Sequence, residues 1–265
     1  MTDEKLRLGG MALRNGLLVH GPTHWAAAVR TRGGEIAVAS GRKPDLGAAS
    51  AERLPGVRGV MKLAEAMAVI PLVKRALPEA RLPMQDVKTL GAMGAAALAG
   101  QAVRTVARSV AAREAAVAAI SLTPALMALR SGDLAAYHGV EHKAIAAYEE
   151  DGDAADALKE HDRCGSHLVA PMLTVAALGN IAARSAGLRG PAAEVVVGLG
   201  SAAVAVEVFA WSERHPNSSL TRMLRLPGHE IQRAVGTREP TAEQLEVGRA
   251  ALAEILGVEG AAPSA

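Results

Sequence analysis

The sequence predicts an α+β fold, in which a small N-terminal antiparallel β-meander precedes a mainly helical bundle embedded in a membrane. Short apolar runs separated by turn residues fill residues 8–40, and four long, nearly uncharged segments rich in alanine follow further along the chain. The first pattern is typical of strands and the second of buried or membrane helices. We therefore expect a β region at residues 1–55, and a helical region at residues 56–265 with about four Ala-rich helices.

Turn signals bound the expected strands. Leu17-Leu18-Val19 is a short apolar run that ends at Gly21-Pro22. Residues 25–32 and 35–40 flank Gly33-Gly34. Because two glycines between two such runs are typical of a two-residue β-hairpin, we expect these strands to pair.

Four apolar segments form the expected bundle, and they lie near residues 89–103, 115–129, 168–183 and 192–211. The first three are 15 or 16 residues long, shorter than the roughly 20 residues that cross a bilayer core. Aromatic residues make up only 2% of the chain, which leaves few for the belts at the two membrane surfaces. A soluble bundle of alanine-rich helices is therefore the alternative. The low charge of the segments and the short basic links between them favour membrane insertion.

Two further helices flank the apolar segments. Residues 57–76 have apolar positions at helical spacing, after a polar connector at residues 41–55. Near the C-terminus, Thr241 and Gln244 have the spacing of a capping box, which predicts an amphipathic helix at residues 242–256.

Composition excludes some classes of function. The formal net charge is +2, and with few aromatic residues for base stacking this balance argues against nucleic acid as a partner. A single cysteine excludes an internal disulfide and suits a reducing compartment. The N-terminal residues lack a basic segment followed by an apolar one, so we expect no cleaved signal peptide.

The most informative motif is an H-x-x-E-H pattern formed by His138, Glu141 and His142 in a segment expected to be helical. A spacing of four places both imidazoles on one face of a helix, with the carboxylate beside them. Two imidazoles can hold a divalent metal, and the carboxylate can act as a base or a further ligand. The alternative is an amphipathic helix whose histidines are satisfied by neighbouring groups.

A second group of metal-binding residue types follows about twenty residues later. His161, Cys164 and His167 lie close together in the sequence, and imidazole and thiolate suit zinc. The alternative is that Cys164 is a small buried residue and the two histidines lie in a solvated loop. Glu207 is a carboxylate inside an apolar segment, where it is either functional or close enough to the helix end to reach water. The other histidines, including His20, lie in turns or connectors and are expected at the surface.

At these residues the chain resembles the YqhQ-like bacterial proteins. The resemblance rests on two motifs, Tyr137 to Lys143 and His161-x-Arg163-Cys164-Gly165-Ser166, and on weaker agreement elsewhere. The weaker agreement is at Gly9-Gly10-Met11-Ala12, Pro55-Gly56-Val57-Arg58-Gly59, Glu207-Val208, Pro227-Gly228, Thr237-Arg238-Glu239-Pro240 and residues 243–247. The family is described as membrane proteins and predicted metal-dependent enzymes without a settled substrate, and the resemblance implies the same here. This chain has Asn15 where the family usually has Glu, and its apolar segments are unusually rich in alanine.

These observations predict a multi-pass protein of the bacterial cytoplasmic membrane. Basic residues are more numerous at the segment ends that adjoin the three larger polar regions, so we expect both terminal regions to be cytoplasmic. The lipid bilayer is the expected partner, and a homo-oligomer is possible.

Two functions remain open. In the first, the protein is a metal-dependent hydrolase in which His138 and His142 bind a divalent ion, and zinc is the expected ion. His161, Cys164 or Glu207 would complete the ligands, Glu141 would be the base, and no other cofactor is expected. In the second, the protein is a non-enzymatic transporter, channel or scaffold whose metal site is structural or regulatory. An open coordination position for water would distinguish the first from the second.

Overall fold

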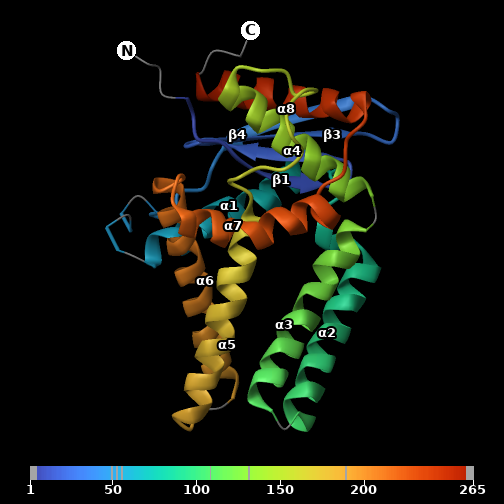
Figure 1. The fold of residues 1–265 in the computed structure, drawn as a ribbon. Helices are drawn as coiled ribbons and strands as arrows, with labels where there is room; N and C mark the ends of the chain where they lie inside the picture. Colours follow the sequence, from blue (N-terminus) through green and yellow to red (C-terminus); the bar gives the residue numbers. More distant parts are fainter. Residues whose placement is uncertain are drawn as a thin grey trace.

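The α+β prediction is confirmed by the computed structural model of this chain. It describes residues 5–48, 50–51, 53–54, 56–107, 109–130, 132–188 and 190–260. Pro55, which belongs to one of the sequence motifs, lies outside these residues. The described residues contain a four-stranded antiparallel sheet followed by eight α-helices. In Figure 1 the sheet lies in an upper part, which we call the head, and two helical hairpins extend downwards from it.

The sheet is a meander with the strand order β1-β2-β3-β4. Its strands are β1 (Gly9–Leu13), β2 (Gly16–His20), β3 (His24–Arg30) and β4 (Ile36–Arg42). The hairpin around Gly33-Gly34 is present, but its expected two-residue turn is wrong. The Thr31 amide donates to the Glu35 carbonyl, and Gly34 has a φ of 89° between them. A positive φ is accessible to glycine at little cost, so the longer turn closes there.

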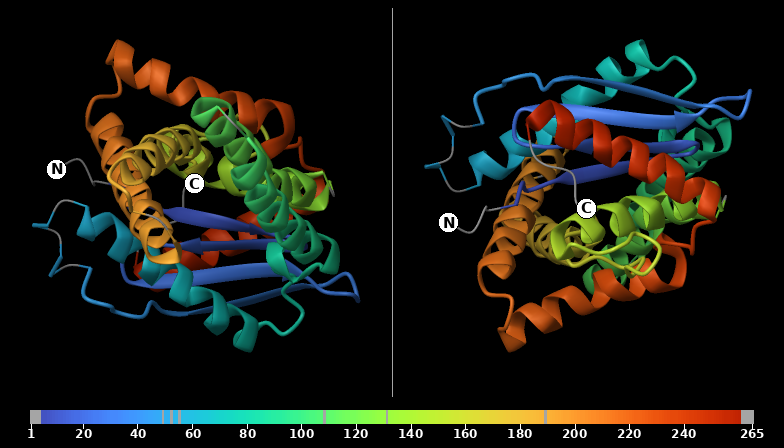
Figure 2. Two further views of the ribbon diagram at one scale, coloured as in Figure 1. Left: turned by 90° about the horizontal axis from the view of Figure 1, so that it is seen from below. Right: turned by 90° about the horizontal axis from the view of Figure 1, so that it is seen from above.

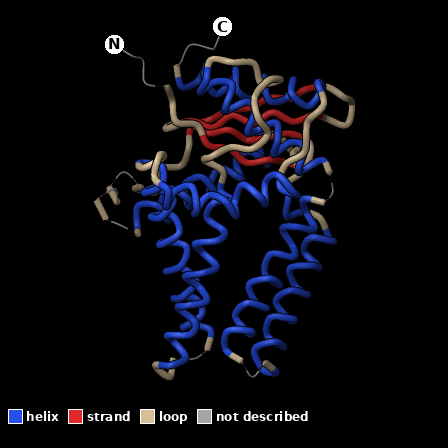
Figure 3. Tube along the Cα trace, in the orientation of Figure 1, coloured by secondary structure: helices blue, strands red, loops and turns tan. Residues whose placement is uncertain are grey.

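Both faces of the sheet are buried, which explains why β2 and β3 have almost continuous apolar runs. Leu17 and Val19 of β2 contact α4 and α8 on one face. Leu18 of β2 alternates to the other face, where it packs with Val69 and Val73 of α1. The head therefore has three layers, with the sheet in the middle, as the red strands between blue helices in Figure 3 show.

The helices form pairs along the sequence. The hairpins consist of α2 (Val87–Val106) with α3 (Val110–Leu129) and α5 (Val169–Ser185) with α6 (Pro191–Arg214). The remaining helices belong to the head or its base: α1 (Val57–Ala76), α4 (Asp133–Glu150), α7 (Ser219–Ile231) and α8 (Ala242–Glu259). Short turns are η1 (Pro83–Gln85), η2 (Gly165–Leu168) and the π-helical η3 (Gln232–Gly236). Thr241 and Gln244 form the expected capping box of α8.

Three helices in the part of the chain that the structure describes are long and apolar enough to cross a membrane. They are α3 with 20 residues, η2 and α5 together with 21, and α6 with 24. The expected span at residues 89–103 lies in α2, which is built largely from alanine and glycine and is not among the three. Few residues in these three helices are buried within the protein. The number of passes and the side on which the termini lie remain predictions.

Helices α1 and α7 run across the direction of the hairpins, at the base of the head (Figure 1). Seen from below in Figure 2, they lie along opposite edges of the molecule, with the hairpins between them. The base of the head is therefore bordered by two helices that lie perpendicular to the hairpins.

Candidate metal centre

Helix α4 holds the H-x-x-E-H residues inside the head. It packs against β1 and β2 on one side and against α8 on another, and most of its residues are buried. The ring centroids of His138 and His142 lie 4.3 Å apart. The helix thus presents both imidazoles together, as the spacing of four predicts.

Backbone carbonyls fix the orientation of both imidazoles. His138 Nδ1 lies 2.8 Å from the Gly236 carbonyl oxygen in the π-helical turn η3, and His142 Nδ1 lies 2.7 Å from the Lys159 carbonyl oxygen. A carbonyl only accepts, so each neutral ring donates its Nδ1 proton and keeps a free lone pair on Nε2. Histidines that bind a metal usually donate their other ring N–H to an acceptor of this kind.

The Nε2 atom of His142 is buried and has no hydrogen-bond partner among the described residues. Only 1% of His142 is exposed to solvent. A buried polar atom without a partner loses its hydration and gains nothing in return, at a cost of about 1–3 kcal/mol. Four other buried nitrogens, three on arginines and one on Trp25, also lack a partner among the described residues, so the atom points to a bound group only together with the imidazole and thiol beside it.

Cys164 completes a set of three ligand atoms. Its Sγ lies 3.4 Å from His138 Nε2 and also accepts a hydrogen bond from the Ser166 amide at the start of η2. His138, His142 and Cys164 offer ligand atoms that all lie within 4.8 Å of one another, an arrangement that could hold a metal ion. Tetrahedral zinc separates its nitrogen and sulfur ligands by about 3.5 Å, so small side-chain movements would close this set.

Glu141 lies beside the three ligand atoms. Its Oε2 is 4.0 Å from His138 Nε2, and the residue is buried. A Cβ atom on Gly10 of β1 would lie only 2.7 Å from both Cγ and Oε1 of Glu141. The glycine therefore allows the carboxylate to lie directly over the strand.

A cavity of about 440 Å³ opens beside these residues. Its lining includes the three ligand residues, Glu141, the apolar side chains of β1 and the ends of α3 and α4. His20 also lines it, and its imidazole lies over Gly9, where a Cβ would be 2.9 Å from the ring. Burial, and then the positive charge of Lys43, lower the pKa of His20 from 6.5 to about 4. The expectation that His20 is a surface histidine is therefore wrong.

His161 lies next to the three ligand residues without belonging to their group. Its ring centroid is 5.7 Å from that of His142, but its Nε2 faces Glu149 Oε2 at 3.2 Å. Arg163 also contacts Glu149. Burial raises the pKa of Glu149, but the hydrogen bond from His161 and the charge of Arg163 outweigh it and leave the pKa below its ordinary value. His161 is thus oriented by a carboxylate.

Glu207 is not near the three ligand residues. Both of its carboxylate oxygens contact Arg58, at 3.0 Å and 2.5 Å, and Oε1 also accepts the Gly56 amide at 2.8 Å. The carboxylate of α6 therefore holds the N-terminal end of α1, and it is the partner of the arginine in the Val57-Arg58-Gly59 motif. The structure does not bring it to the metal-binding group.

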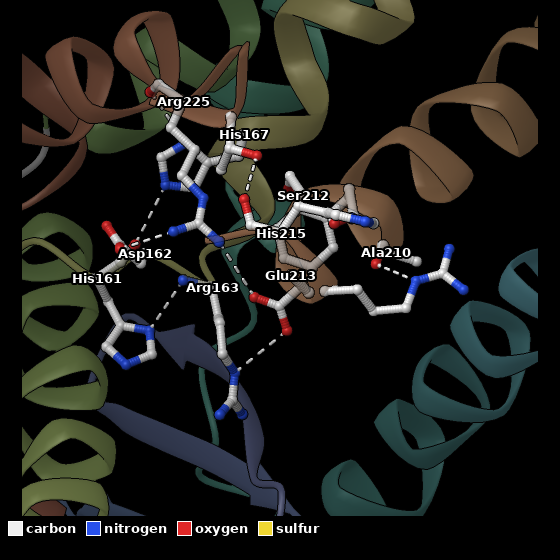
Figure 4. Close-up of polar contacts among 12 residues, drawn as sticks. His161, Asp162, Arg163, His167, Ala210, Ser212, Glu213, His215 and Arg225 are labelled. Carbon is white, nitrogen blue, oxygen red and sulfur yellow. Dashed lines mark hydrogen bonds and ion pairs between the residues drawn. The ribbon is translucent and has the colours of Figure 1, made fainter. Parts of the chain in front are cut away.

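A network of arginines and carboxylates holds the loop that carries Cys164, as Figure 4 shows. Glu213 at the end of α6 lies between Arg163, at 3.8 Å, and Arg225 of α7, at 3.5 Å. Arg225 also contacts Asp162 at 2.7 Å. Asp162, His167 and His229 form a second group with metal-binding residue types. Because the Arg225 guanidinium already neutralises Asp162, we assign this group to the network and not to a second ion.

Neither the carbonyl partners of the two histidines nor the arginine network could be predicted from the sequence. Gly236, Lys159 and Glu213 are distant in the chain from His138 and His142, and their contacts depend on how α6, α7 and η3 pack. The adjacent glycines at positions 9 and 10 were the available signal for His20 and Glu141. Two glycines within a strand indicate that other groups approach the backbone closely.

Comparison with known proteins assigns the chain to a family but gives it no function. No curated protein and no solved structure matches the chain. One family matches residues 117–258, which include His138, His142, Cys164, Glu141, the apolar helices α5 and α6 and part of α3, but not the sheet. Because the match covers more than half of the chain, this protein belongs to the DUF1385 family, whose members are described as proteins of unknown function.

Proposed function

We propose that this protein is a membrane-anchored, metal-dependent hydrolase, in which His138, His142 and Cys164 bind one divalent ion. The observation that carries the proposal is the buried Nε2 atom of His142, which points to a bound group because no described residue satisfies it. The adjacent atoms are a second imidazole nitrogen and a sulfur. Imidazole together with thiolate favours zinc over the harder ions Mg²⁺ and Ca²⁺.

Three protein ligands leave one position of a tetrahedral site open, which is typical of catalytic zinc. A zinc ion bound there would supply Lewis acidity, which makes water a nucleophile near neutral pH. Glu141, whose Oε2 lies 4.0 Å from His138 Nε2, is the proposed general base. It takes the proton from the attacking water and returns it to the leaving group, and Gly10 gives it the space to do so.

Membrane anchoring is supported by the apolar surfaces of the hairpins. Leu178 of α5 is 62% exposed, and Val196 and Leu199 of α6 are 69% and 60% exposed. Soluble monomers rarely expose a continuous apolar surface of this extent, whereas lipid tails would cover it. The cavity reaches Leu129 at the end of α3 and Ser166 in η2, the turn that precedes α5. The proposed site is thus close to the end of the hairpins that joins the head.

The first test is the metal content of protein purified in detergent without chelators. We expect about one zinc per chain, as for a mononuclear site. The variant His142→Ala should lose it, whereas the control His229→Ala should keep it, since His229 belongs to the arginine network. Purified protein that lacks metal and does not bind micromolar zinc would contradict the proposal.

Cobalt substitution tests the sulfur ligand directly. Cobalt(II) bound to a thiolate has an intense charge-transfer band that oxygen and nitrogen ligands alone do not give. We expect this band in the cobalt protein and its loss in Cys164→Ser, with binding retained through the two imidazoles. If the band is absent from the unaltered protein, Cys164 is not a ligand.

A closed, structural site is the alternative, and one distance favours it. Glu141 Oε2 lies only 4.0 Å from His138 Nε2, close enough to become a fourth ligand after a small rotation. Four protein ligands would exclude the water that a hydrolase needs. The protein would then be a non-enzymatic transporter, channel or scaffold stabilised by a metal, and variants of Glu141 separate the two functions.

A further inference from the structure

On helix α7 two polar residues are buried against the protein, whereas three large apolar residues are exposed. Thr221 and Arg225 are 0% and 9% exposed, whereas Leu220, Met223 and Leu226 are 45%, 59% and 60% exposed. A helix on the surface of a soluble protein has the opposite arrangement, with its apolar side facing the core. The surface formed by Leu220, Met223 and Leu226, which we call the outer face of α7, needs a partner.

The inner face of α7 is fixed by specific contacts, so the helix cannot turn its apolar residues inward. Arg225 contacts Asp162 and Glu213, as Figure 4 shows. The Thr221 hydroxyl donates to the His215 carbonyl at 2.8 Å. Rotation of the helix would break the Arg225 ion pairs and take this partner away from the largely buried carboxylate of Glu213.

We propose that α7 lies in the interface of an anionic lipid bilayer, with Leu220, Met223 and Leu226 inserted at the level where headgroups meet acyl chains. This inference rests on the membrane anchoring of the proposed function, but not on the metal or on the hydrolase chemistry. An in-plane helix of this kind buries its apolar side in the boundary and keeps its polar side away from it.

The position of α7 favours lipid over a second copy of the chain. The helix crosses the hairpins at the base of the head, where α5 and α6 enter it (Figure 1). It also contacts α5, one of the proposed membrane helices, so the outer face lies close to the region that lipid would cover. Helix α1, which lies on the opposite edge (Figure 2) and also at the base of the head (Figure 1), exposes a similar set of apolar residues, Leu63, Met67 and Leu72. One flat bilayer would cover both edges, whereas a partner chain at one edge would leave the other uncovered.

The residues around the outer face suit an anionic lipid surface. Arg222 of α7 and Arg214 at the end of α6 are both exposed. Trp211 stacks on His215 at the same end of α6, with ring centroids 4.6 Å apart. Tryptophan and basic side chains are typical of the boundary between lipid and water.

Photo-crosslinking in nanodiscs of phosphatidylglycerol and phosphatidylethanolamine tests this placement in the full chain. Met223 is replaced by p-benzoylphenylalanine, the sample is irradiated, and lipid adducts are measured by mass spectrometry. The same residue at Val196 of α6 reports insertion of the hairpins, and at Ala253, exposed on α8, it reports background. Because the three side chains are exposed, the replacements should not disturb folding.

We expect lipid adducts at Met223 comparable to those at Val196, with background only at Ala253. Adducts at Val196 without adducts at Met223 would overturn the placement of α7 and leave the membrane anchoring intact. Crosslinks from Met223 to a second chain would also overturn it and identify the outer face as an interface between copies. An absence of adducts at both Val196 and Met223 would overturn the inference together with the membrane anchoring.

Discussion

Glu141 lies directly over the backbone of Gly10, so closely that a Cβ atom on Gly10 would be 2.7 Å from the Glu141 carboxylate oxygen Oε1. This contact joins the N-terminal sheet to the H-x-x-E-H helix across more than a hundred residues of chain. The sheet therefore sets the position of the proposed base, although it lies outside the residues that match the family.

The first prediction follows from this contact. In Gly10→Ala the added methyl group must displace Glu141, because the backbone of β1 is paired with β2 and the glutamate side chain is the part that can move. Glu141 then presses on the ligand residues beside it, and we expect zinc affinity to fall about 10- to 100-fold, the size typical of changes next to metal ligands. Isothermal titration of zinc into apoprotein measures it.

Gly33→Ala is the matched control for this prediction. Gly33 lies in the turn between β3 and β4, and a Cβ there would meet only the Thr31 hydroxyl at 3.7 Å. This variant should bind zinc as the unaltered protein does. Equal zinc affinity in Gly10→Ala and Gly33→Ala would show that the contact with Glu141 does not matter for the site.

The second prediction separates Glu207 from the metal. Glu207→Gln removes the negative charge that pairs with Arg58 and weakens the hydrogen bonds at the start of α1. We expect a loss of about 1–2 kcal/mol of stability, because hydrogen bonds to charged groups contribute about this much. The bound zinc should stay at the level of the unaltered protein. The thermal midpoint in detergent and the metal content measure the two effects.

Glu35→Gln serves as the control, since Glu35 is an exposed carboxylate in the turn between β3 and β4. It should change neither the midpoint nor the metal content. A Glu207→Gln protein that loses its zinc while it stays folded would restore Glu207 as a ligand.

The sequence predicts those parts of the fold and site that depend on short spacing. His138 and His142 share a helical face because four residues make about one turn, and the observed rings are neighbours. The strands of the meander follow from apolar runs between turn residues. The helices that cover the two faces of the sheet could not be predicted from the sequence. In the folded chain α1 covers one face, and α4 and α8 cover the other.

Long-range partners could not be predicted from the sequence. Cys164 belongs to a recognisable group of metal-binding residue types, but its 3.4 Å contact with His138 depends on the path of the loop after α4. His161 has the same residue type and is closer to Glu149 than to the ligand atoms. Glu207 looked like a candidate ligand because it is a carboxylate in an apolar segment, and only the fold shows that Arg58 lies opposite it.

The third prediction concerns the pH dependence of stability through His20. Its pKa is about 4 in the folded protein and 6.5 at its ordinary value. Below pH 6.5 the unfolded chain therefore binds a proton at His20 that the folded protein does not bind until about pH 4. The stabilisation that comes from keeping His20 neutral is therefore complete above pH 6.5 and is lost as the pH falls to 4. The free energy of unfolding should decrease by about 3 kcal/mol over this range.

His20→Gln isolates this contribution, because glutamine does not titrate in this range. We expect the thermal midpoint of the unaltered protein to fall more steeply between pH 6.5 and pH 4 than that of the variant. All other titrating groups are shared and cancel in the comparison. Parallel curves for the two proteins would mean that His20 titrates normally in the fold.

The last prediction separates catalysis from a structural metal at Glu141. In the hydrolase, Glu141→Gln keeps the shape of the side chain but removes the group that accepts the proton. Loss of a general base typically lowers the rate about 10²- to 10⁴-fold. Zinc content should be unchanged, because His138, His142 and Cys164 remain. His142→Ala, in contrast, should lose both zinc and function, since it removes a ligand whose Nε2 has no other described partner.

In a closed structural site the two variants behave differently. If Glu141 is the fourth ligand, Glu141→Gln would lower the zinc content, and if it is not a ligand, the variant would leave the site unaffected. In both cases function would follow the zinc content and not the charge at residue 141. The decisive measurement is zinc stoichiometry and complementation of a deletion strain for both variants, side by side. Full zinc with lost complementation in Glu141→Gln supports the base, because the charge is then needed for a step other than metal binding. Full zinc with full complementation in the same variant would eliminate the hydrolase mechanism and leave the ion as a structural support for the head.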